Sequence, residues 1–170
     1  FREDWMEHRL NCLKNFGIVD QEHVVWVGGN AKMNEFQAAM GLCNLHHLDQ
    51  EIDRRRLVVE RYLSGLAGVP GIRLPSFREG LTPNYAYFPV LFEDFKADRD
   101  QVYDCLAGHR IYPRKYFYPL INDFQCYKGR FSSKDTPVAA YVADRVLTLP
   151  CYADLELEDV DRICGIIRGM

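Results

Sequence analysis

Residues 28–39 read GGNAKMNEFQAA, and they mark the change from a glycine-containing loop to a long helical pattern. Gly28 and Gly29 permit backbone angles that other residues avoid, and they let a ligand approach the main chain closely. Asn30 and Lys32 lie just before the expected helix, whose first N–H groups and dipole favour an anion such as phosphate. An ordinary capped helix start explains the same residues without a ligand, and on physical grounds alone it is the simpler interpretation.

The helical pattern extends from about Met33 to Leu66, as one helix or as two in tandem. Apolar residues recur every seven positions from Leu45 onward, while the middle of the segment is charged. A helix of this length would measure about 50 Å, more than a domain of this size needs internally. We therefore predict that it bridges domains or subunits.

The residues before the glycines form a smaller pattern. Apolar residues at helical spacing between Trp5 and Leu13 predict a short helix that ends near Gly17, a residue suited to a C-cap. A short apolar run follows at residues 24–27.

After the long helix, glycines and prolines at positions 68–80 predict a connecting segment. Strand-like residues follow at 85–92, where Pro89 argues for an edge strand or a bulge. Further strands are expected at 111–112 and 146–150.

Helix signals alternate with these strands. Asp98 is a candidate N-cap for a helix closed by Gly108, Thr136 and Pro137 suit another helix start, and residues 160–167 carry the apolar stripe of a final helix. The alternation predicts an α/β (α+β) layer, with a small sheet of three or four strands covered on one face by helices.

Composition excludes several classes of protein. Of 170 residues, 48% are hydrophobic, which is enough for a folded core, and length alone favours one domain. The net charge of −3 with scattered basic residues argues against nucleic-acid binding. No apolar run approaches the ~20 residues that a membrane helix needs. The first residue, Phe1, is not methionine, which indicates a processed chain or a fragment.

The six cysteines contain no C-x-x-C pair, and we interpret them as buried free thiols of a cytoplasmic protein. The adjacent His46 and His47 would point about 100° apart on a helix, so they are a poor metal pair.

A second candidate site combines cations with aromatic rings, because residues 110–119 read RIYPRKYFYP. Such a segment can hold a diphosphate by charge and stack a sugar or base on a ring, although an aromatic loop that covers the core would look the same. No nucleophile, base and orienting group occur in a known catalytic pattern. Taken alone, the chain does not look like a complete enzyme.

With these motifs in view, residues 28–39 resemble the G-x-N-x-[RK]-M-x-E-x-Q-A-A segment of the DegT/DnrJ/EryC1/StrS family of sugar aminotransferases. The resemblance continues through residues 84–90, 114–120 and 149–152, in the order of the family. The amino-acid sequences of these segments look closest to those of members that act on dTDP-linked keto-deoxysugars.

The resemblance implies the C-terminal part of a fold-type I enzyme that uses pyridoxal 5′-phosphate (PLP). Residues 1–32 would be the end of the large PLP-binding domain, residues 33–67 an interdomain helix, and residues 68–170 the small α/β domain. The lysine that forms the Schiff base with PLP would lie upstream of Phe1, so this chain would supply no catalytic residue and would be inactive alone.

The same resemblance assigns roles to individual residues. Asn30 matches an asparagine that reaches the PLP phosphate of the other subunit of a homodimer, and Lys32 stands where arginine is frequent, which retains the charge but not the two-pronged geometry. Arg114, Lys115 and Tyr116 match a loop that borders the substrate, a nucleotide-linked keto-sugar. The implied reaction is transamination with glutamate as the amino donor.

Two alternatives remain open. A free-standing α/β binding or regulatory module would also lack a catalytic set, but it gives no reason for the phosphate-suited loop or the long helix. A minimal PLP protein with Lys32 as its Schiff-base lysine would further need a carboxylate against the pyridine nitrogen and a packed pocket.

Overall fold

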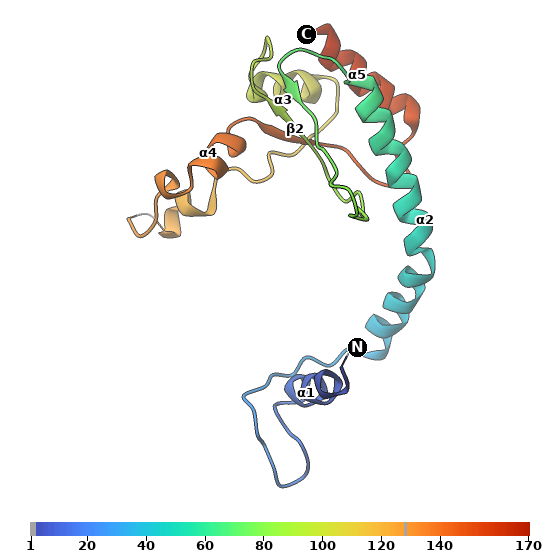
Figure 1. Cartoon of the computed structure of the whole chain (residues 1–170), viewed down its shortest axis with the longest axis vertical. Helices are drawn as coiled ribbons and strands as arrows, with labels where there is room; N and C mark the ends of the chain where they lie inside the picture. Colours follow the sequence, from blue (N-terminus) through green and yellow to red (C-terminus); the bar gives the residue numbers. More distant parts are fainter. Residues whose placement is uncertain (1–2, 128) are drawn as a thin grey trace. The chain divides into compact units, whose positions relative to one another are not determined.

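The computed structural model describes residues 3–127 and 129–170 of the chain (Figure 1). They divide into two compact units, Phe1–Leu48 and Asp49–Met170.

The first unit begins with helix α1, Asp4–Lys14, and the chain then folds back on the end of this helix. The backbone N–H of Gly29 donates to the carbonyl of Leu13 at 2.9 Å, and that of Ala31 donates to Lys14 at 3.0 Å. The predicted helix end near Gly17 is confirmed. Gly17 has a φ of +80°, and a Cβ there would lie 1.7 Å from the carbonyl oxygen of Trp26, so only glycine fits.

The long helix α2 is continuous and spans Glu35–Gly65, so the tandem alternative is wrong. It starts two residues later than the pattern suggested. Asn34 and Gln37 form a reciprocal cap: each backbone N–H donates to the other's side-chain oxygen, at 3.0 and 2.9 Å.

A small antiparallel sheet lies in the second unit, as expected. Its strands are β1, Ile72–Arg73, β2, Phe88–Phe92, and β3, Val146–Leu149, in the order β1-β2-β3. β1 lies in the segment that was predicted to be only a connection. The sequence did not predict this strand, because two residues are too few to give a periodic signal.

Pro89 lies in the middle strand, and the expectation that its strand is an edge is wrong. Thr148, opposite Pro89, exchanges both of its backbone hydrogen bonds with Arg114 on its other side. The nitrogen of Pro89 therefore faces away from β3, toward the side where β1 pairs only with Leu91 and Phe92. No hydrogen bond of the sheet is lost at the proline.

Helices follow each of the longer strands. Helix α3, Arg99–Gly108, has the predicted Asp98 cap, which Gln101 completes as a capping box. Helix α4, Pro137–Ala143, begins at Pro137 as predicted, although the Thr136 side chain makes no capping bond. Helix α5, Leu157–Gly169, is the expected final helix. Single 3₁₀ turns occur at Ile121–Asp123, Gln125–Tyr127 and Ser133–Asp135.

The strand predicted at residues 111–112 is wrong. Ile111 is buried in the core, but the chain meets β3 only at Arg114, whose N–H and carbonyl bond to Thr148 at 3.0 and 2.7 Å. Because Arg114 exchanges both hydrogen bonds with Thr148, the next bonded pair would be Tyr112 with Pro150, which offers no N–H, so the pairing does not extend into a ladder.

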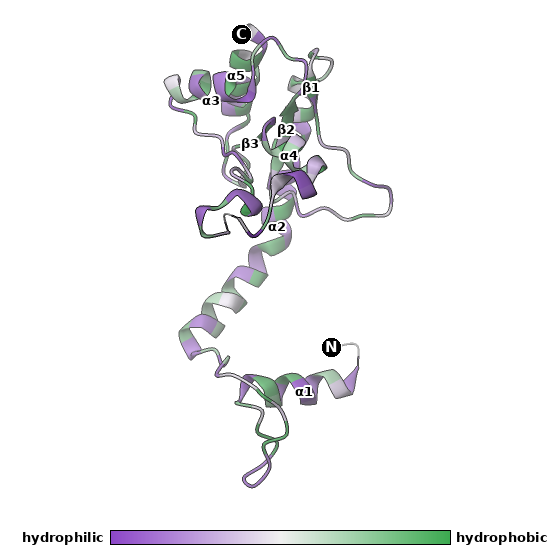
Figure 2. Ribbon diagram, turned by 90° about the vertical axis from the view of Figure 1, so that its left-hand side faces the viewer, coloured by the Kyte–Doolittle hydropathy of each residue, from purple (hydrophilic) through white to green (hydrophobic). Residues whose placement is uncertain are grey.

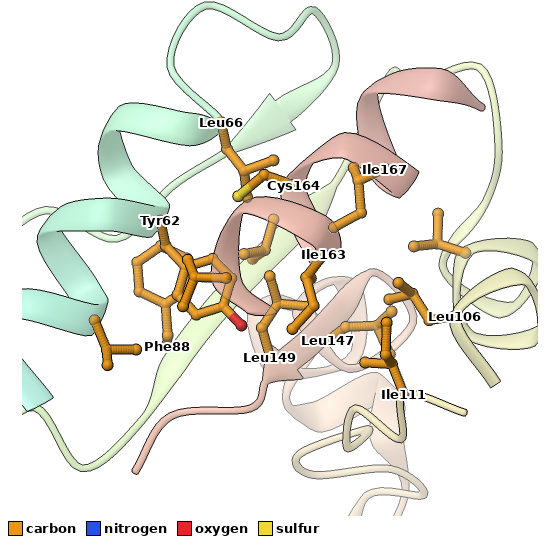
Figure 3. Close-up of a cluster of buried hydrophobic side chains, with 14 of the residues drawn as sticks. Tyr62, Leu66, Phe88, Leu106, Ile111, Leu147, Leu149, Ile163, Cys164 and Ile167 are labelled. Atoms are coloured by element: carbon orange, nitrogen blue, oxygen red, sulfur yellow. The ribbon is translucent and has the colours of Figure 1, made fainter. Parts of the chain in front are cut away.

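The core of the second unit gathers apolar side chains from α2, α3 and α5 around β2 and β3 (Figure 3). Tyr62 of α2 stacks on Phe88 of β2, with ring centroids 4.8 Å apart. Hydrophobic residues of β2 and α5 appear green in Figure 2. At the surface, Arg61 of α2 and Asp161 of α5 form a two-pronged ion pair with both contacts at 2.6 Å.

All six cysteines are free, but the expectation that they are buried holds only for Cys12 and Cys164. Cys43, on α2, and Cys126, in a 3₁₀ turn, are exposed, and Cys105 and Cys151 are half-buried.

Candidate functional site

An open cavity of about 950 Å³ lies along the loop after Ile111. Its lining is largely aromatic and comes from Tyr103 of α3 and from residues 112–119, 121 and 124. The pairing of Arg114 with Thr148 fixes the start of this loop against β3. A cavity of this size is ample for a small-molecule ligand.

A second cavity of about 410 Å³ adjoins the first. It is lined by Tyr87, Thr148, Cys151 and Tyr152 among others, and Tyr112, Arg114 and Tyr116 border both cavities. Arg114 and Tyr116, two of the three residues to which the family resemblance gives a role in substrate binding, therefore line both cavities.

Arg114 is exposed, and its guanidinium interacts with Tyr116. Its Nη1 donates to the Tyr116 hydroxyl at 2.9 Å, and its Cζ lies 5.6 Å from the centroid of that ring. Within residues 3–127 and 129–170, no carboxylate forms an ion pair with Arg114. A cation beside aromatic rings suits an anionic ligand that also carries a ring.

Lys115 is in a different environment. Its ammonium pairs with the carboxylate of Asp100 and lies 4.8 Å from the centroid of the Tyr103 ring. The hydrogen bond from Lys115, together with one from Arg99, lowers the pKa of Asp100 below its ordinary value.

Arg99 is a buried charge, with 3% of its surface exposed. Its Nε donates to Asp100 at 2.7 Å and its Nη1 to the carbonyl of Ala143 at 2.8 Å. Its Cζ also lies 4.6 Å from the centroid of the Tyr118 ring. These contacts compensate the buried guanidinium and join α3, α4 and the aromatic loop.

The other predicted pair, Asn30 and Lys32, belongs to the first unit. Lys32 Nζ donates to Asn15 Oδ1 at 3.1 Å and lies 5.3 Å from the centroid of the Phe16 ring. The backbone of Asn30 pairs with Asn15, and its side chain is exposed. The structure thus brings Asn30 and Lys32 to one strand-like return beside the end of α1.

This segment fits the phosphate end of PLP better than the whole cofactor. An exposed carboxamide and an ammonium are suitable donors to a phosphate. The N–H of Gln37 at the start of α2 is already satisfied by Asn34, so the helix start offers fewer free donors than the sequence suggested. The Lys32 ammonium contacts an amide and a ring; no carboxylate of the described residues pairs with it.

Sequence reasoning missed the residues that hold the aromatic loop. Arg99, Asp100 and Tyr103 lie in the helix predicted after Asp98, and Tyr87 lies in the strand-like segment 85–92, but none of these residues was predicted to belong to a site. The acidic residue directly after an arginine was the only available signal, and it does not reveal a contact with a lysine fifteen positions later.

Two other kinds of site receive no support. The described part of the chain contains no group of three or more histidine, cysteine or acidic side chains that could hold a metal ion. None of the described helices is both long and apolar enough to cross a membrane.

Comparison with known proteins gives one consistent result. A model of the DegT/DnrJ/EryC1/StrS aminotransferase family matches residues 1–168. The dTDP-4-amino-4,6-dideoxy-D-glucose transaminase of Escherichia coli is 42% identical over 164 residues, which are 95% of this chain and 44% of that protein.

Solved structures agree with this match. DesV of S. venezuelae, in complex with a ketimine intermediate, superimposes with a TM-score of 0.86 at 31% identity, over 98% of this chain and 44% of DesV. The PLP form of the Streptococcus pneumoniae protein Spr1654 reaches 0.83 at 24% identity, over 98% of this chain and 44% of that one, and supports the fold alone. The chain thus spans less than half the length of the relatives it matches.

Proposed function

The chain belongs to the DegT/DnrJ/EryC1/StrS aminotransferase family, and from this membership we propose that it forms the C-terminal part of a PLP-dependent sugar aminotransferase. The complete enzyme would transfer an amino group, with glutamate as donor, to a dTDP-linked keto-deoxysugar. The observation that carries this proposal is the 42% identity to a dTDP-aminodeoxyglucose transaminase over 95% of the chain.

We further propose that residues 1–32 end a large PLP-binding domain, that 33–67 form an interdomain helix, and that 68–170 form the small domain. The uneven burial of the chain supports a difference between its N-terminal and C-terminal parts. In described residues 3–48, Cys12 is the one buried apolar side chain, whereas the core cluster draws on residues 58–167. A segment so poor in core needs further protein to cover it.

In the complete enzyme, Asn30 and Lys32 would bind the phosphate of PLP, with Asn30 reaching the cofactor of the other subunit of a homodimer. PLP, when bound, supplies the electron sink for transamination. The chain's own residues would contribute binding and orientation. The lysine that holds PLP would come from the preceding domain, so the 170-residue chain should be inactive alone.

The loop with Arg114, Lys115 and Tyr116 would bind the nucleotide-linked sugar. The aromatic lining of the larger cavity suits a base or a sugar ring, and the exposed guanidinium of Arg114 suits a diphosphate. The smaller cavity, which shares Arg114 and Tyr116, offers space for the other end of the same substrate.

Reductive trapping tests whether the lysine that binds PLP is absent from this chain. The purified chain is mixed with PLP, reduced with borohydride, and its intact and digested masses are measured. We expect no stoichiometric adduct, because the trapping lysine lies outside this chain. Full labelling at one lysine, above all Lys32, would contradict the proposal, since it would reveal a complete PLP site here.

The substrate class is tested separately by titrating the chain with dTDP and with inorganic phosphate. The proposal expects dTDP to bind more tightly than phosphate and Arg114→Met to weaken that binding. Equal binding of both ligands, unaffected by Arg114→Met, would argue against a nucleotide site in this loop.

A further inference from the structure

Within the aromatic loop, we propose that the two neighbouring cations have different tasks: Arg114 contacts the diphosphate of the substrate, whereas Lys115 is a positioning residue held by Asp100. This inference rests on the proposed function of the loop. It adds Asp100 and Arg99 to the residues on which substrate binding depends.

The environment of Lys115 leaves it little freedom to bind a ligand. Its ammonium pairs with the Asp100 carboxylate, and its position over the Tyr103 ring adds a cation–π contact. A move toward a phosphate would break the ion pair and leave the carboxylate facing the same anion. The charge of Lys115 is therefore already paired within the chain, in an ion pair that is partly open to solvent.

The first turn of α3 holds the loop at one further point, the ring of Tyr118. Arg99, bound to Asp100, places its guanidinium over the Tyr118 ring, and the N–H of Tyr118 donates to the Lys115 carbonyl at 2.8 Å. Because Arg99 is buried and also bound to the Ala143 carbonyl, its own position is fixed. Lys115 and Tyr118 are thus both fastened to α3.

Arg114 is arranged in the opposite way. Its backbone is fixed by two hydrogen bonds to Thr148, while its guanidinium uses one of five N–H donors, on Tyr116. The residue is exposed and borders both cavities. A fixed backbone with unused donors at the end of the side chain is the arrangement expected for a residue that binds a diphosphate.

A double-mutant cycle with dTDP as the probe separates the two tasks. Isothermal titration of the full chain would measure the affinity of three single variants, Arg114→Met, Lys115→Met and Asp100→Asn. It would also measure the double variant that combines Lys115→Met and Asp100→Asn. Methionine keeps an apolar stem over the Tyr103 ring. We expect about a tenfold or greater loss of affinity for Arg114→Met, the size of a lost charged hydrogen bond. Lys115→Met and Asp100→Asn should give smaller, matching losses, and the double variant should lose no more than either.

A loss for Lys115→Met that equals that of Arg114→Met, and that persists in the Asp100→Asn background, would overturn the proposal. Lys115 would then be a direct phosphate ligand.

Hydrogen exchange without any nucleotide tests whether the pairing of Lys115 with Asp100 holds the aromatic loop against α3. In Lys115→Met and in Asp100→Asn, we expect faster exchange in the peptide that covers residues 113–120. The double variant should exchange no faster there than either single variant. Exchange in α5 should be unchanged in all three. Unchanged exchange at 113–120 would overturn the positioning role. If dTDP fails to bind the unsubstituted chain, the proposed nucleotide site in this loop fails, while the exchange data still decide whether Asp100 holds Lys115.

Discussion

At the scale of single residues, Tyr62 is unusual because its buried hydroxyl has no hydrogen-bond partner among the described residues. The ring stacks on Phe88, and burial raises the pKa of the phenol. An unsatisfied buried hydroxyl costs free energy that phenylalanine would not incur. We expect Tyr62→Phe to raise the free energy of unfolding by about 1 kcal/mol.

Urea unfolding monitored by circular dichroism measures this change. Tyr141→Phe is the matched control, because the exposed Tyr141 hydroxyl donates to Glu93 at 2.9 Å and its loss should not stabilise the fold. A lower stability for Tyr62→Phe would mean that the hydroxyl has a partner, such as a bound water.

Cys164 links stability to pH. Burial raises the pKa of its thiol from 9.0 to about 11, so the folded state keeps the proton after the unfolded state has lost it. The resulting contribution to the free energy of unfolding is fully present below pH 9. It is lost as the pH rises toward 11, which lowers the free energy of unfolding by roughly 2–3 kcal/mol. The buried Tyr62 phenol acts in the same direction at the upper end of this range.

Unfolding free energies at several pH values between 8 and 11 would show this as a falling curve. Cys164→Ala should flatten the curve, whereas Cys43→Ala, at an exposed position, should leave its slope unchanged. Parallel curves for Cys164→Ala and the unsubstituted chain would disprove the assignment.

At the scale of elements, the capping box of α3 offers a direct test. Asp98 accepts a bond from the Gln101 N–H at 2.8 Å, and Gln101 accepts one from the Asp98 N–H at 2.9 Å. We expect Asp98→Ala to lower stability by about 1 kcal/mol, the usual cost of a lost N-cap. Asp104→Ala, an exposed carboxylate later in the same helix, is the control and should change stability little. Equal effects of both substitutions would show that charge, and not the cap, matters.

Elements with strong local signals could be predicted from the sequence. The long helix, the Asp98 cap, the Pro137 start and the β3 strand each depend on residues within one short window. The strand at 111–112 failed because Pro150, the next residue that would bond to it, offers no N–H. β1 was missed because its two residues acquire strand geometry only by pairing with β2.

The candidate site divides in the same way. The cations and rings of residues 114–116 were visible as composition, since they are neighbours in the chain. Their separate surroundings were not, because Asp100 meets Lys115, and Thr148 meets Arg114, only after the chain has folded.

At the scale of the whole molecule, burial is distributed unevenly. Large apolar side chains are exposed in the first unit, and on its part of α2 they include Phe36, Met40 and Leu45, exposed by 89%, 63% and 63%. Apolar surfaces of this extent favour association. We expect the isolated chain to self-associate at micromolar concentrations.

Sedimentation velocity over a concentration series would detect this association. The double variant Phe36→Ser with Met40→Ser should shift the chain toward the monomer. Gln50→Ser, at an exposed polar position of the same helix, should not. A monomeric unsubstituted chain at all concentrations would mean that these side chains are tolerated in water.

The distribution of the thiols gives the molecule a pair of natural labelling positions. Cys43 is exposed in the first unit and Cys126 in the second, whereas Cys12 and Cys164 are buried. Brief reaction with maleimide dyes should therefore label Cys43 and Cys126 before the half-buried Cys105 and Cys151 and the two buried thiols react. Energy transfer between the two dyes would then report the separation of the units in solution, with and without dTDP, with no engineered cysteine.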